Sequence, residues 1–324
     1  MKKNQLIRFN LFLALILLTT NILAQTQNFV WGQRYGQSEN DEAIDMATSE
    51  NGTSYLIGEF KSDTFIIGNY TLTANASINY FIAKFSDDGN VIWAKNLTAL
   101  YDIYPNAICL DAEENYTITG SFGLDSLLLG NDLLIGGNGP MFVAKFDSSG
   151  APIWGSSLDG NGADVGFNVT TFNNITYVIG GYRSSVLTTA TATFYNSINT
   201  NYYDIFLIKY DNNGNEVWAK SFNGAGQDKG LGITTDSNGN VLITGQFYSP
   251  NLSFGDDTLY NTSGSLNYAD VFIAKISSDG NILWKKNGKG QYDDIANSIK
   301  TDNNQNIYVT GSFYGQNFIF DNDT

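Results

Sequence analysis

The segment Val271-Phe272-Ile273-Ala274-Lys275-Ile276-Ser277-Ser278-Asp279-Gly280-Asn281-Ile282-Leu283-Trp284 reads as two short strands joined by a Ser-Asp-Gly-Asn turn. Three earlier copies end at Trp93, Trp154 and Trp218, and Trp31 stands where a further copy would end. Successive tryptophans are 61 to 66 residues apart. Each copy has a lysine nine residues before its tryptophan (Lys84, Lys145, Lys209, Lys275) and a glycine four residues before it (Gly89, Gly150, Gly214, Gly280). Such regularity indicates a repeat architecture.

Each repeat unit carries further β signals and no helical period. A strand ending in Gly-x-Phe or Gly-x-Tyr follows every tryptophan by 26 or 27 residues, at Gly58, Gly120, Gly180, Gly245 and Gly311. In the fourth unit the pattern predicts strands at about 229–235, 240–247, 270–277 and 281–286, with turn-forming residues between them. Most units also insert an apolar-Gly-Asn/Asp-apolar element between their second and third strands, which predicts an extra hairpin.

Four antiparallel strands with one tryptophan per unit are typical of a β-propeller blade, whose apolar faces are covered by neighbouring blades. We therefore predict an all-β fold, an incomplete propeller of four-stranded antiparallel blades. Four full units run over about 41–96, 106–157, 164–222 and 228–286, followed by a partial fifth from Asp294. An outer strand is expected at 28–35. Residues 25–324 would then be one propeller domain cut mid-blade, a fragment of a longer protein.

The five tryptophans are expected to hold the blades together. A tryptophan is large and flat and buries about 200 Å² of surface, which suits the groove between two packed sheets. The predicted blade-docking residues are Trp31, Trp93, Trp154, Trp218 and Trp284.

The repeat resembles the SBBP family of β-propeller repeats found in bacterial extracellular proteins. In that pattern a tryptophan is followed by a Gly-rich stretch with Asp, an Asp-x-x-Gly-Asn turn, a strand ending in Gly, and Asp-x-Phe-x-x-Lys-x-x-x-x-Gly-x-x-x-Trp. The fourth unit matches at Trp218, Asp228, Asp236, Gly239, Asn240, Gly245, Asp270, Phe272, Lys275, Gly280 and Trp284. The resemblance covers about residue 31 to the end and implies a propeller. It implies no particular activity, because the family is defined by its architecture.

Residues 1–24 are predicted to be a signal peptide. Lys2, Lys3 and Arg8 supply positive charge, residues 9–18 are apolar except for Asn10, and Ala24 is a small residue at the expected cut. The alternative is an uncleaved anchor, whereas a lipoprotein leader is excluded because no cysteine lies near the cut. We therefore expect a secreted or outer-membrane-surface protein whose mature chain does not span the membrane. The leader and the Asn-rich repeat resemble Bacteroidetes proteins exported by type IX secretion.

Composition limits the chemistry of the chain. It has 17 Lys and Arg against 32 Asp and Glu, a net charge of −15, which argues against nucleic acid or an anionic membrane as a partner. It has no histidine, which removes Ser-His and Cys-His triads and the commonest zinc ligand. The single cysteine, Cys109, forms no internal disulfide and is expected to be a buried apolar residue rather than a nucleophile.

One repeated acid suggests a ligand site. Asp41, Asp164, Asp228 and Asp294 each stand ten residues after a tryptophan, whereas the second unit has Ile103 there. They start the innermost strands and would form a ring at one channel mouth. Such a ring suits Ca²⁺ or a polyhydroxyl ligand. The favoured alternative is a repeated turn in which the carboxylate accepts backbone N–H bonds.

The remaining motifs favour structure over catalysis. Asp-x-x-Gly turns, as at 147–150 and 211–214, lack the spacing of calcium loops and are predicted to be hairpin turns. The repeated lysines are predicted to be snorkelling or edge-protecting residues. We predict a binding or scaffold module for a protein or glycan at the cell surface, with no catalytic residues and no cofactor other than Ca²⁺. The alternative is a carbohydrate-active or quinone-linked enzyme with its catalytic residues on mouth loops or in a missing C-terminal part.

Overall fold

A computed structural model describes residues 31–320, except 38, 98–102, 124–125, 130–131, 138, 197–200, 263–265 and 316–317. Contacts divide the chain into two units, residues 1–32 and 33–324, and the fold below is that of the second. The predicted signal peptide, residues 1–24, lies outside the described part. Within the described part there is no helix long and apolar enough to cross a membrane.

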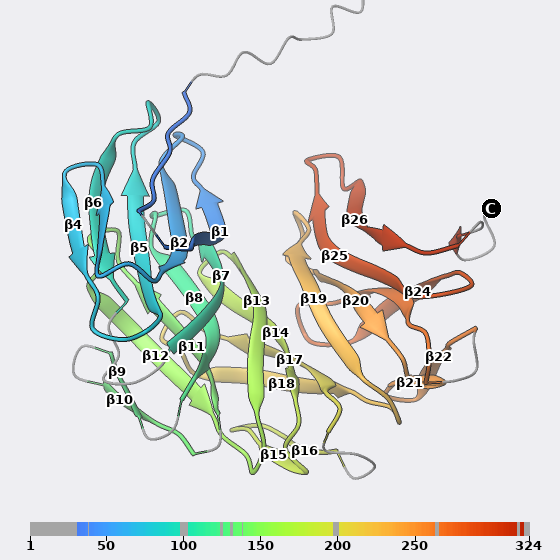
Figure 1. The fold of residues 1–324 in the computed structure, drawn as a ribbon. Helices are drawn as coiled ribbons and strands as arrows, with labels where there is room; N and C mark the ends of the chain where they lie inside the picture. The colour runs from blue at the N-terminus through green and yellow to red at the C-terminus, as the bar shows by residue number, and fades with distance from the viewer. Residues whose placement is uncertain are drawn as a thin grey trace, which may run out of the picture. The chain divides into compact units, whose positions relative to one another are not determined.

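The second unit is a β-propeller of antiparallel blades (Figure 1). The first blade contains β1 (Asp41–Thr48), β2 (Ser54–Phe60), β5 (Asn79–Phe85) and β6 (Val91–Asn96). The second contains β7 (Ile103–Leu110), β8 (Tyr116–Phe122), β11 (Met141–Phe146) and β12 (Pro152–Leu158). The third contains β13 (Asp164–Phe172), β14 (Ile175–Tyr182), β17 (Asp204–Tyr210) and β18 (Glu216–Phe222). The fourth contains β19 (Asp228–Thr235), β20 (Val241–Phe247), β23 (Asp270–Ile276) and β24 (Ile282–Lys289).

The fifth blade has two described strands of its own, β25 (Asp294–Thr301) and β26 (Ile307–Phe313). The predicted all-β class, the four-stranded blades and the partial fifth blade are confirmed. The predicted strands of the fourth unit match the observed ones to within a few residues at each end.

The predicted extra hairpins occur in all four complete blades. They are β3 (Thr64–Ile67) with β4 (Tyr70–Thr73), β9 (Ser126–Leu129) with β10 (Asp132–Ile135), β15 (Val186–Thr188) with β16 (Thr193–Tyr195), and β21 (Asn251–Phe254) with β22 (Asp257–Tyr260). They lie near the outer strands, and Ser253 of β21 bridges to Asn223 after β18. In the same way β27 (Ile319–Phe320) pairs with the end of β24. The hairpins of the first, second and fourth blades thus lie against the outer strand of a blade.

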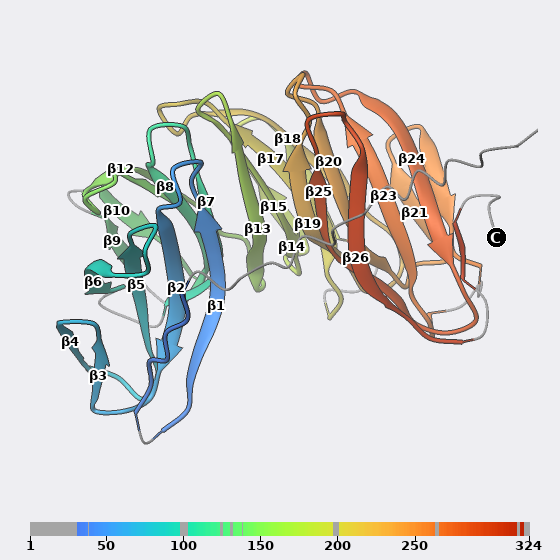
Figure 2. The ribbon, with the colours of Figure 1, turned by 90° about the horizontal axis from the view of Figure 1, so that it is seen from above.

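Neighbouring blades pack through their innermost strands. β1 contacts β7, β7 contacts β13, β13 contacts β19, and β19 contacts β25 (Figure 2). Each inner strand has a β-bulge near its start, and bulges bend a strand and increase its twist. The Asn106 amide at one bulge donates to the Gly166 carbonyl (2.9 Å), and Asn168 donates to the Leu231 carbonyl (3.0 Å). Side-chain amides therefore join consecutive blades along the inner strands.

The core lies between the blades, and tryptophans close it. The indole N–H of Trp93 donates to the Ser148 carbonyl of the next blade (3.3 Å), and Trp218 donates to the Ser278 carbonyl (3.0 Å). Trp154 is 6% exposed and packs on Tyr210 with ring centroids 5.8 Å apart. Each of these rings therefore contacts the turn between the third and fourth strands of the following blade, or the strand that leads into that turn.

Glycine is required in this docking turn for two reasons. Gly214 has φ of +81°, a left-handed conformation that L side chains rarely adopt. A Cβ atom there would also come within 2.6 Å of the Trp154 ring. Trp284 packs against the core cluster shared with the fifth blade, and Trp31 is 37% exposed.

The expected outer strand at 28–35 is not found in its described part. Residues 31–35 have no strand, and the ring of Tyr35 instead lies 6.1 Å from that of Phe85 in the first blade. A strand needs a sheet edge to pair its N–H and C=O groups. Such a strand would complete the last blade, and the fifth blade contains only β25 and β26 among the described residues, so no outer edge for it is present there.

Candidate functional site

The most irregular feature of the described blades is a polar groove of about 750 Å³. It lies where the turns between the first and second strands of the first three blades meet. We call it the acidic groove. Its lining is Thr48, Ser49, Glu50, Asn51, Leu110, Asp111, Ala112, Glu113, Glu114, Thr171, Asn173 and Asn174.

Strained residues concentrate in the acidic groove. Among the described residues, non-glycine side chains with positive φ occur at Glu114 (61°), Asn173 (49°), Asn174 (63°) and Gln305 (65°), and the first three line the groove. The matching turns of the first and fourth blades use glycines instead, Gly52 and Gly239. A left-handed non-glycine residue persists only where its surroundings hold it, and such residues cluster at functional sites.

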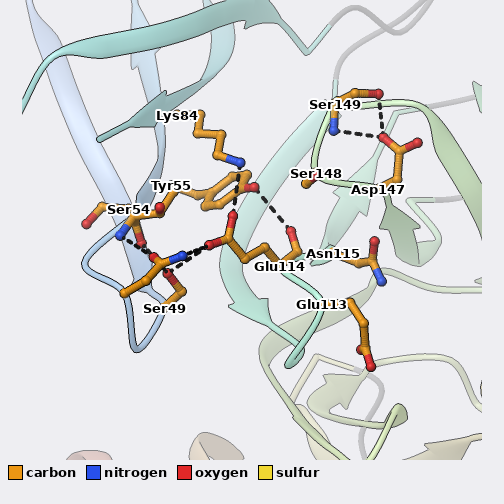
Figure 3. A network of polar contacts seen from close by, with 12 residues as sticks. Ser49, Ser54, Tyr55, Lys84, Glu113, Glu114, Asn115, Asp147, Ser148 and Ser149 are labelled. Atoms are coloured by element: carbon orange, nitrogen blue, oxygen red, sulfur yellow. Dashed lines mark hydrogen bonds and ion pairs between the residues drawn. The ribbon is translucent and has the colours of Figure 1, made fainter. Parts of the chain in front are cut away.

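Contacts from the first blade hold Glu114 in place (Figure 3). Its carboxylate accepts from Lys84 Nζ (3.0 Å), Asn51 Nδ2 (2.5 Å) and Ser49 Oγ (3.3 Å). Its backbone carbonyl accepts from the Tyr55 hydroxyl (3.1 Å). Burial acts to raise the pKa of Glu114, but the hydrogen bonds from Lys84 and Asn51 outweigh it and lower the pKa overall. Glu114 is therefore an anion that ties the second blade to the first.

Asp111 organises the same turn. Its Oδ1 accepts from the backbone N–H groups of Glu113 (3.0 Å) and Asn115 (2.8 Å), which is an Asx turn. Its Oδ2 lies 2.8 Å from Lys145 Nζ, and both side chains are at most 3% exposed. Burial acts to raise the pKa of Asp111, but the contacts with Lys145 and Asn115 lower it overall. The carboxylate is therefore ionised and paired.

The prediction that the repeated lysines snorkel or protect edges is wrong. Lys145 is buried against Asp111, Lys275 lies 2.7 Å from Asp236, and Lys84 pairs with Glu114 of the next blade. Lys209 donates to the Ser278 carbonyl of the next blade (2.8 Å). The antiparallel register places each lysine opposite the start of the second strand, and in the second and fourth blades an aspartate precedes that strand and pairs with the lysine. The lysines therefore neutralise or cap turns.

Two carboxylates of the acidic groove are left for solvent or a partner. The side chains of Glu50 and Glu113 are exposed. Glu113 has one neutral neighbour, the Asn174 amide nitrogen at 2.9 Å in the orientation that satisfies both of its polar atoms. Among the residues that line the groove, lysine and arginine are absent.

The four repeated aspartates begin the inner strands as expected, but their side chains turn toward their own blades. Asp164, Asp228 and Asp294 are fully buried. Asp164 accepts from the backbone N–H groups of Arg183 (3.2 Å) and Ser184 (3.3 Å), and Asp228 accepts from that of Ser249 (3.1 Å). Asp294 and Asp41 accept in the same way from Tyr314 and Gln37.

This geometry favours the structural interpretation of the aspartates over a ligand ring. At least one oxygen of each aspartate accepts from a backbone N–H group, and the Ser184 hydroxyl donates to Asp164 (2.7 Å). One oxygen of Asp41 and one of Asp294 are buried without a hydrogen-bond partner. In the described part of the chain there is no group of three or more acidic or cysteine side chains that could hold a metal ion. A Ca²⁺ ring through these four residues stays a prediction that no observed contact supports.

Two further expectations concern turns and the cysteine. The Asp-x-x-Gly turns are hairpin turns, as predicted: Asp147 accepts from the N–H groups of Ser149 (2.9 Å) and Ala151 (2.9 Å), and Gly150 has φ of +86°. Cys109 lies in β7 and is partly rather than fully buried, and burial raises the pKa of its thiol to about 12. The thiolate is therefore scarce at neutral pH, which argues against a nucleophilic role there.

The acidic groove was not predicted, although the sequence carried a signal for it. The fourth unit has Asp236-Ser237-Asn238-Gly239-Asn240 where the second has Asp111-Ala112-Glu113-Glu114-Asn115. Glycine is lost from a turn that needs a left-handed residue, as it also is in the fifth unit at Gln305. The way in which three blades meet there depends on packing, which the repeat alone does not describe.

Comparison with known proteins supports the architecture. No family model matches the chain. An uncharacterized WD repeat-containing protein of Acanthamoeba polyphaga mimivirus is 23% identical over 338 residues, which cover 83% of this chain and 24% of that protein. The chain thus spans about a quarter of that relative's length. Both the blades and this relative indicate a propeller repeat protein.

Two solved structures show a distant likeness. One is a protein of unknown function from Bacteroides caccae, with a TM-score of 0.36 and 10% identity over 78% of this chain and 84% of that one. The other is the Pan2 WD40 domain of Neurospora crassa, with a TM-score of 0.33 and 8% identity over 85% of this chain and 90% of that one.

The buried Lys145–Asp111 pair should behave as a unit. Replacing one partner leaves an uncompensated buried charge, so Lys145→Met or Asp111→Asn alone should lower the free energy of unfolding by about 3–5 kcal/mol. The double variant should recover much of the loss. Denaturant unfolding of the two single variants and the double variant measures the coupling. Additive losses would contradict pairing.

The stability contributed by Asp228 should depend on pH in the direction opposite to that of a salt bridge. Burial raises the pKa of Asp228 to about 8, despite hydrogen bonds from Ser249 that lower it, against 3.8 for the ordinary side chain. The folded state therefore binds the proton more tightly, and the contribution is full below about pH 4 and lost as the pH rises through about 8. The melting temperature of Asp228→Asn minus that of wild type should therefore be more positive at about pH 9 than at about pH 5.

The matched control for this experiment is Asp211→Asn in an exposed hairpin turn. The hydrogen bond from Asn215 lowers the pKa of Asp211, so its contribution is present at neutral pH and lost only in acid, and the effect of Asp211→Asn should be the same at about pH 5 and about pH 9. A difference between wild type and Asp228→Asn that does not vary with pH would contradict the buried, protonated Asp228.

Proposed function

We propose that the protein is a protein-interaction module whose acidic groove takes a basic segment of a partner. One observation carries the proposal. Three left-handed, non-glycine residues, Glu114, Asn173 and Asn174, line one groove, whereas the matching turns of the first and fourth blades use glycine. The repeat is therefore broken in favour of polar side chains at a place where three blades meet.

The negative charge of the acidic groove indicates that its partner carries positive charge. Asp111 and Glu114 are already paired with lysines, so the surplus charge of the groove belongs to Glu50 and Glu113. Each exposed contact with a partner Lys or Arg contributes only about 0.2–1 kcal/mol and is screened by salt. Useful affinity therefore needs several such contacts at once, helped by the long-range field of a chain with net charge −15.

A protein partner suits the groove better than a glycan does. The residues that line it include no aromatic ring on which a sugar could stack. They offer carboxylates, amides and hydroxyls, which accept hydrogen bonds from lysine, arginine and backbone N–H groups.

An enzyme would need acid and base groups with separated pKa values. The pKa values of Asp111 and Glu114 are both lowered, so neither is a general acid near neutral pH.

We further propose that the module is exported and displayed at the cell surface. The support is the charged and apolar pattern of residues 1–24, the small residue Ala24 at the expected cut, and the SBBP-like repeat. The resemblance to proteins of type IX secretion supports the same location. Sequencing the N-terminus of the protein recovered from outside the cell tests export, and a chain that starts at Gln25 is the expected result.

A binding experiment with a fluorescent oligolysine peptide tests the groove. Fluorescence anisotropy should show binding that weakens as salt rises. The double substitution Glu50→Gln and Glu113→Gln should weaken it by about 5-fold, in line with the loss of two exposed charge contacts. The control is Asp256→Asn with Asp279→Asn, which removes the same charge from exposed turns of the fourth blade.

Equal weakening by the two double variants would mean that only net charge matters, and it would contradict a defined groove. Binding on a glycan array, or hydrolysis of a glycan, that depends on Glu50 and Glu113 would contradict the protein-partner proposal. It would instead favour a carbohydrate-binding or carbohydrate-active protein.

A further inference from the structure

Two cations share one aromatic ring between the third and fourth blades. The guanidinium carbon of Arg183 lies 4.1 Å from the centroid of the Tyr203 ring, and Lys229 Nζ lies 5.6 Å from the same centroid. Lys229 Nζ also lies 5.7 Å from the centroid of the Phe167 ring. Arg183 follows β14, Tyr203 precedes β17, and Lys229 belongs to β19, which contacts both of these strands. We call these four residues the cation cluster.

The cation cluster lies at the opposite end of the strands from the acidic groove. The start of β13 pairs with the end of β14, Asp164 with Tyr182, directly beside Arg183. The turn at the other end of the same two strands contains Asn173 and Asn174, which line the acidic groove. The third blade therefore carries a negative site at one end and a positive site at the other.

The third unit departs from the repeat to make room for the cation cluster. Gly181 stands where the other units have a larger residue (Glu59, Ser121, Gln246, Ser312). A Cβ atom on Gly181 would lie 3.0 Å from both the Phe167 ring and the Tyr203 ring. The glycine therefore lets these two rings pack over β14, edge to face, with their centroids 5.6 Å apart.

The same glycine replaces the acid that neutralises the corresponding cation of the first blade. Lys61 stands where the third unit has Arg183, and it pairs with Glu59 at 3.1 Å. Gly181 occupies the position of Glu59, so Arg183 has no such partner. Among the described residues neither Arg183 nor Lys229 forms an ion pair, and the buried Nε of Arg183 has no acceptor. A buried donor left without an acceptor costs free energy, which an added acceptor would recover.

Nearby acids do not neutralise the two cations. Asp164, Asp204 and Asp228 begin neighbouring strands, but their carboxylates accept hydrogen bonds from backbone N–H groups of loops. Burial lowers the pKa of Lys229, and the charge of Arg183 lowers it further. An anion beside both cations would relieve their mutual repulsion.

The chemistry of the cluster favours a carboxylate over a phosphate. A guanidinium that stacks on a ring keeps its edge free, and this edge can donate two parallel hydrogen bonds to the oxygens of either group. In a chain with net charge −15, however, a singly charged carboxylate is repelled less than a doubly charged phosphate.

We propose that the cation cluster binds a carboxylate, which the edge of Arg183 and the ammonium group of Lys229 hold together. Two sources present this group: a small free carboxylate, and an aspartate or glutamate side chain of a partner protein. The site is separate from the acidic groove and takes a ligand of the opposite charge.

Anisotropy of a labelled hexaglutamate peptide, measured with the whole protein at constant ionic strength, tests the proposal. The peptide should bind, and Arg183→Gln with Lys229→Gln should weaken binding about 10-fold or more, because charge-assisted hydrogen bonds are lost. Arg183→Lys keeps the charge but not the planar fork, so its effect should be smaller. The matched control, Lys220→Gln with Lys300→Gln, removes the same charge outside the cluster and should weaken binding far less.

Unlabelled glutarate and phosphate distinguish the sources of the anion. Displacement of the peptide by glutarate supports a site for small carboxylates, whereas peptide binding that glutarate does not displace supports a site for acidic side chains. Stronger displacement by phosphate than by glutarate would overturn the proposal, as would equal weakening by the two double variants.

A measurement on the unmodified protein guards against misfolded variants. Glutarate or the peptide should raise the melting temperature above that in chloride of the same ionic strength, because a ligand that binds only the folded state stabilises it. The absence of any such rise, together with no peptide binding, would contradict the proposal. Oligolysine binding at the acidic groove uses other residues, so the two proposals succeed or fail separately.

Discussion

The contact of a tryptophan with the hairpin of the next blade is the interaction on which the rest of the structure depends. A four-stranded sheet with two apolar faces is stable only if neighbours cover both faces. Trp93, Trp154 and Trp218 supply that cover and reach the next blade at the turn or strand beside its glycine. The cores therefore lie between blades, so the stability of each blade depends on its neighbours.

Ion pairs between lysine and aspartate or glutamate then stabilise other turns of the blades. Lys145 and Lys275 neutralise the aspartates that organise turns of their own blades, and Lys84 reaches Glu114 in the next blade. Because these acids are paired, the surplus negative charge of the acidic groove comes from the unpaired, exposed side chains Glu50 and Glu113. The same pairing explains why the acids that are tied to lysines do not resemble a catalytic pair.

The fold could be predicted from the sequence because each repeat unit contains the features that determine a blade. These are strands with alternating apolar residues, glycine at left-handed turns, and one tryptophan. The prediction for the lysines was wrong, because the burial of a lysine opposite the start of a strand depends on whether the adjacent turn places an acid next to it. The repeated aspartates illustrate the same limit, because carboxylates at strand starts suggest a ring until the loop N–H groups that bind them are seen. The acidic groove arises where three turns meet, which the repeat of a single unit does not reveal.

The most direct test of this account is the free energy of unfolding of Trp154→Ala beside that of Ile153→Ala, measured by denaturant and circular dichroism. Trp154 is 6% exposed between blades, whereas Ile153 next to it is 47% exposed. The account predicts a loss of about 3–5 kcal/mol for Trp154→Ala, as for other large buried side chains. It predicts a loss of less than about 1 kcal/mol for Ile153→Ala, an exposed position. Equal losses would contradict the claim that tryptophan docking holds the blades together.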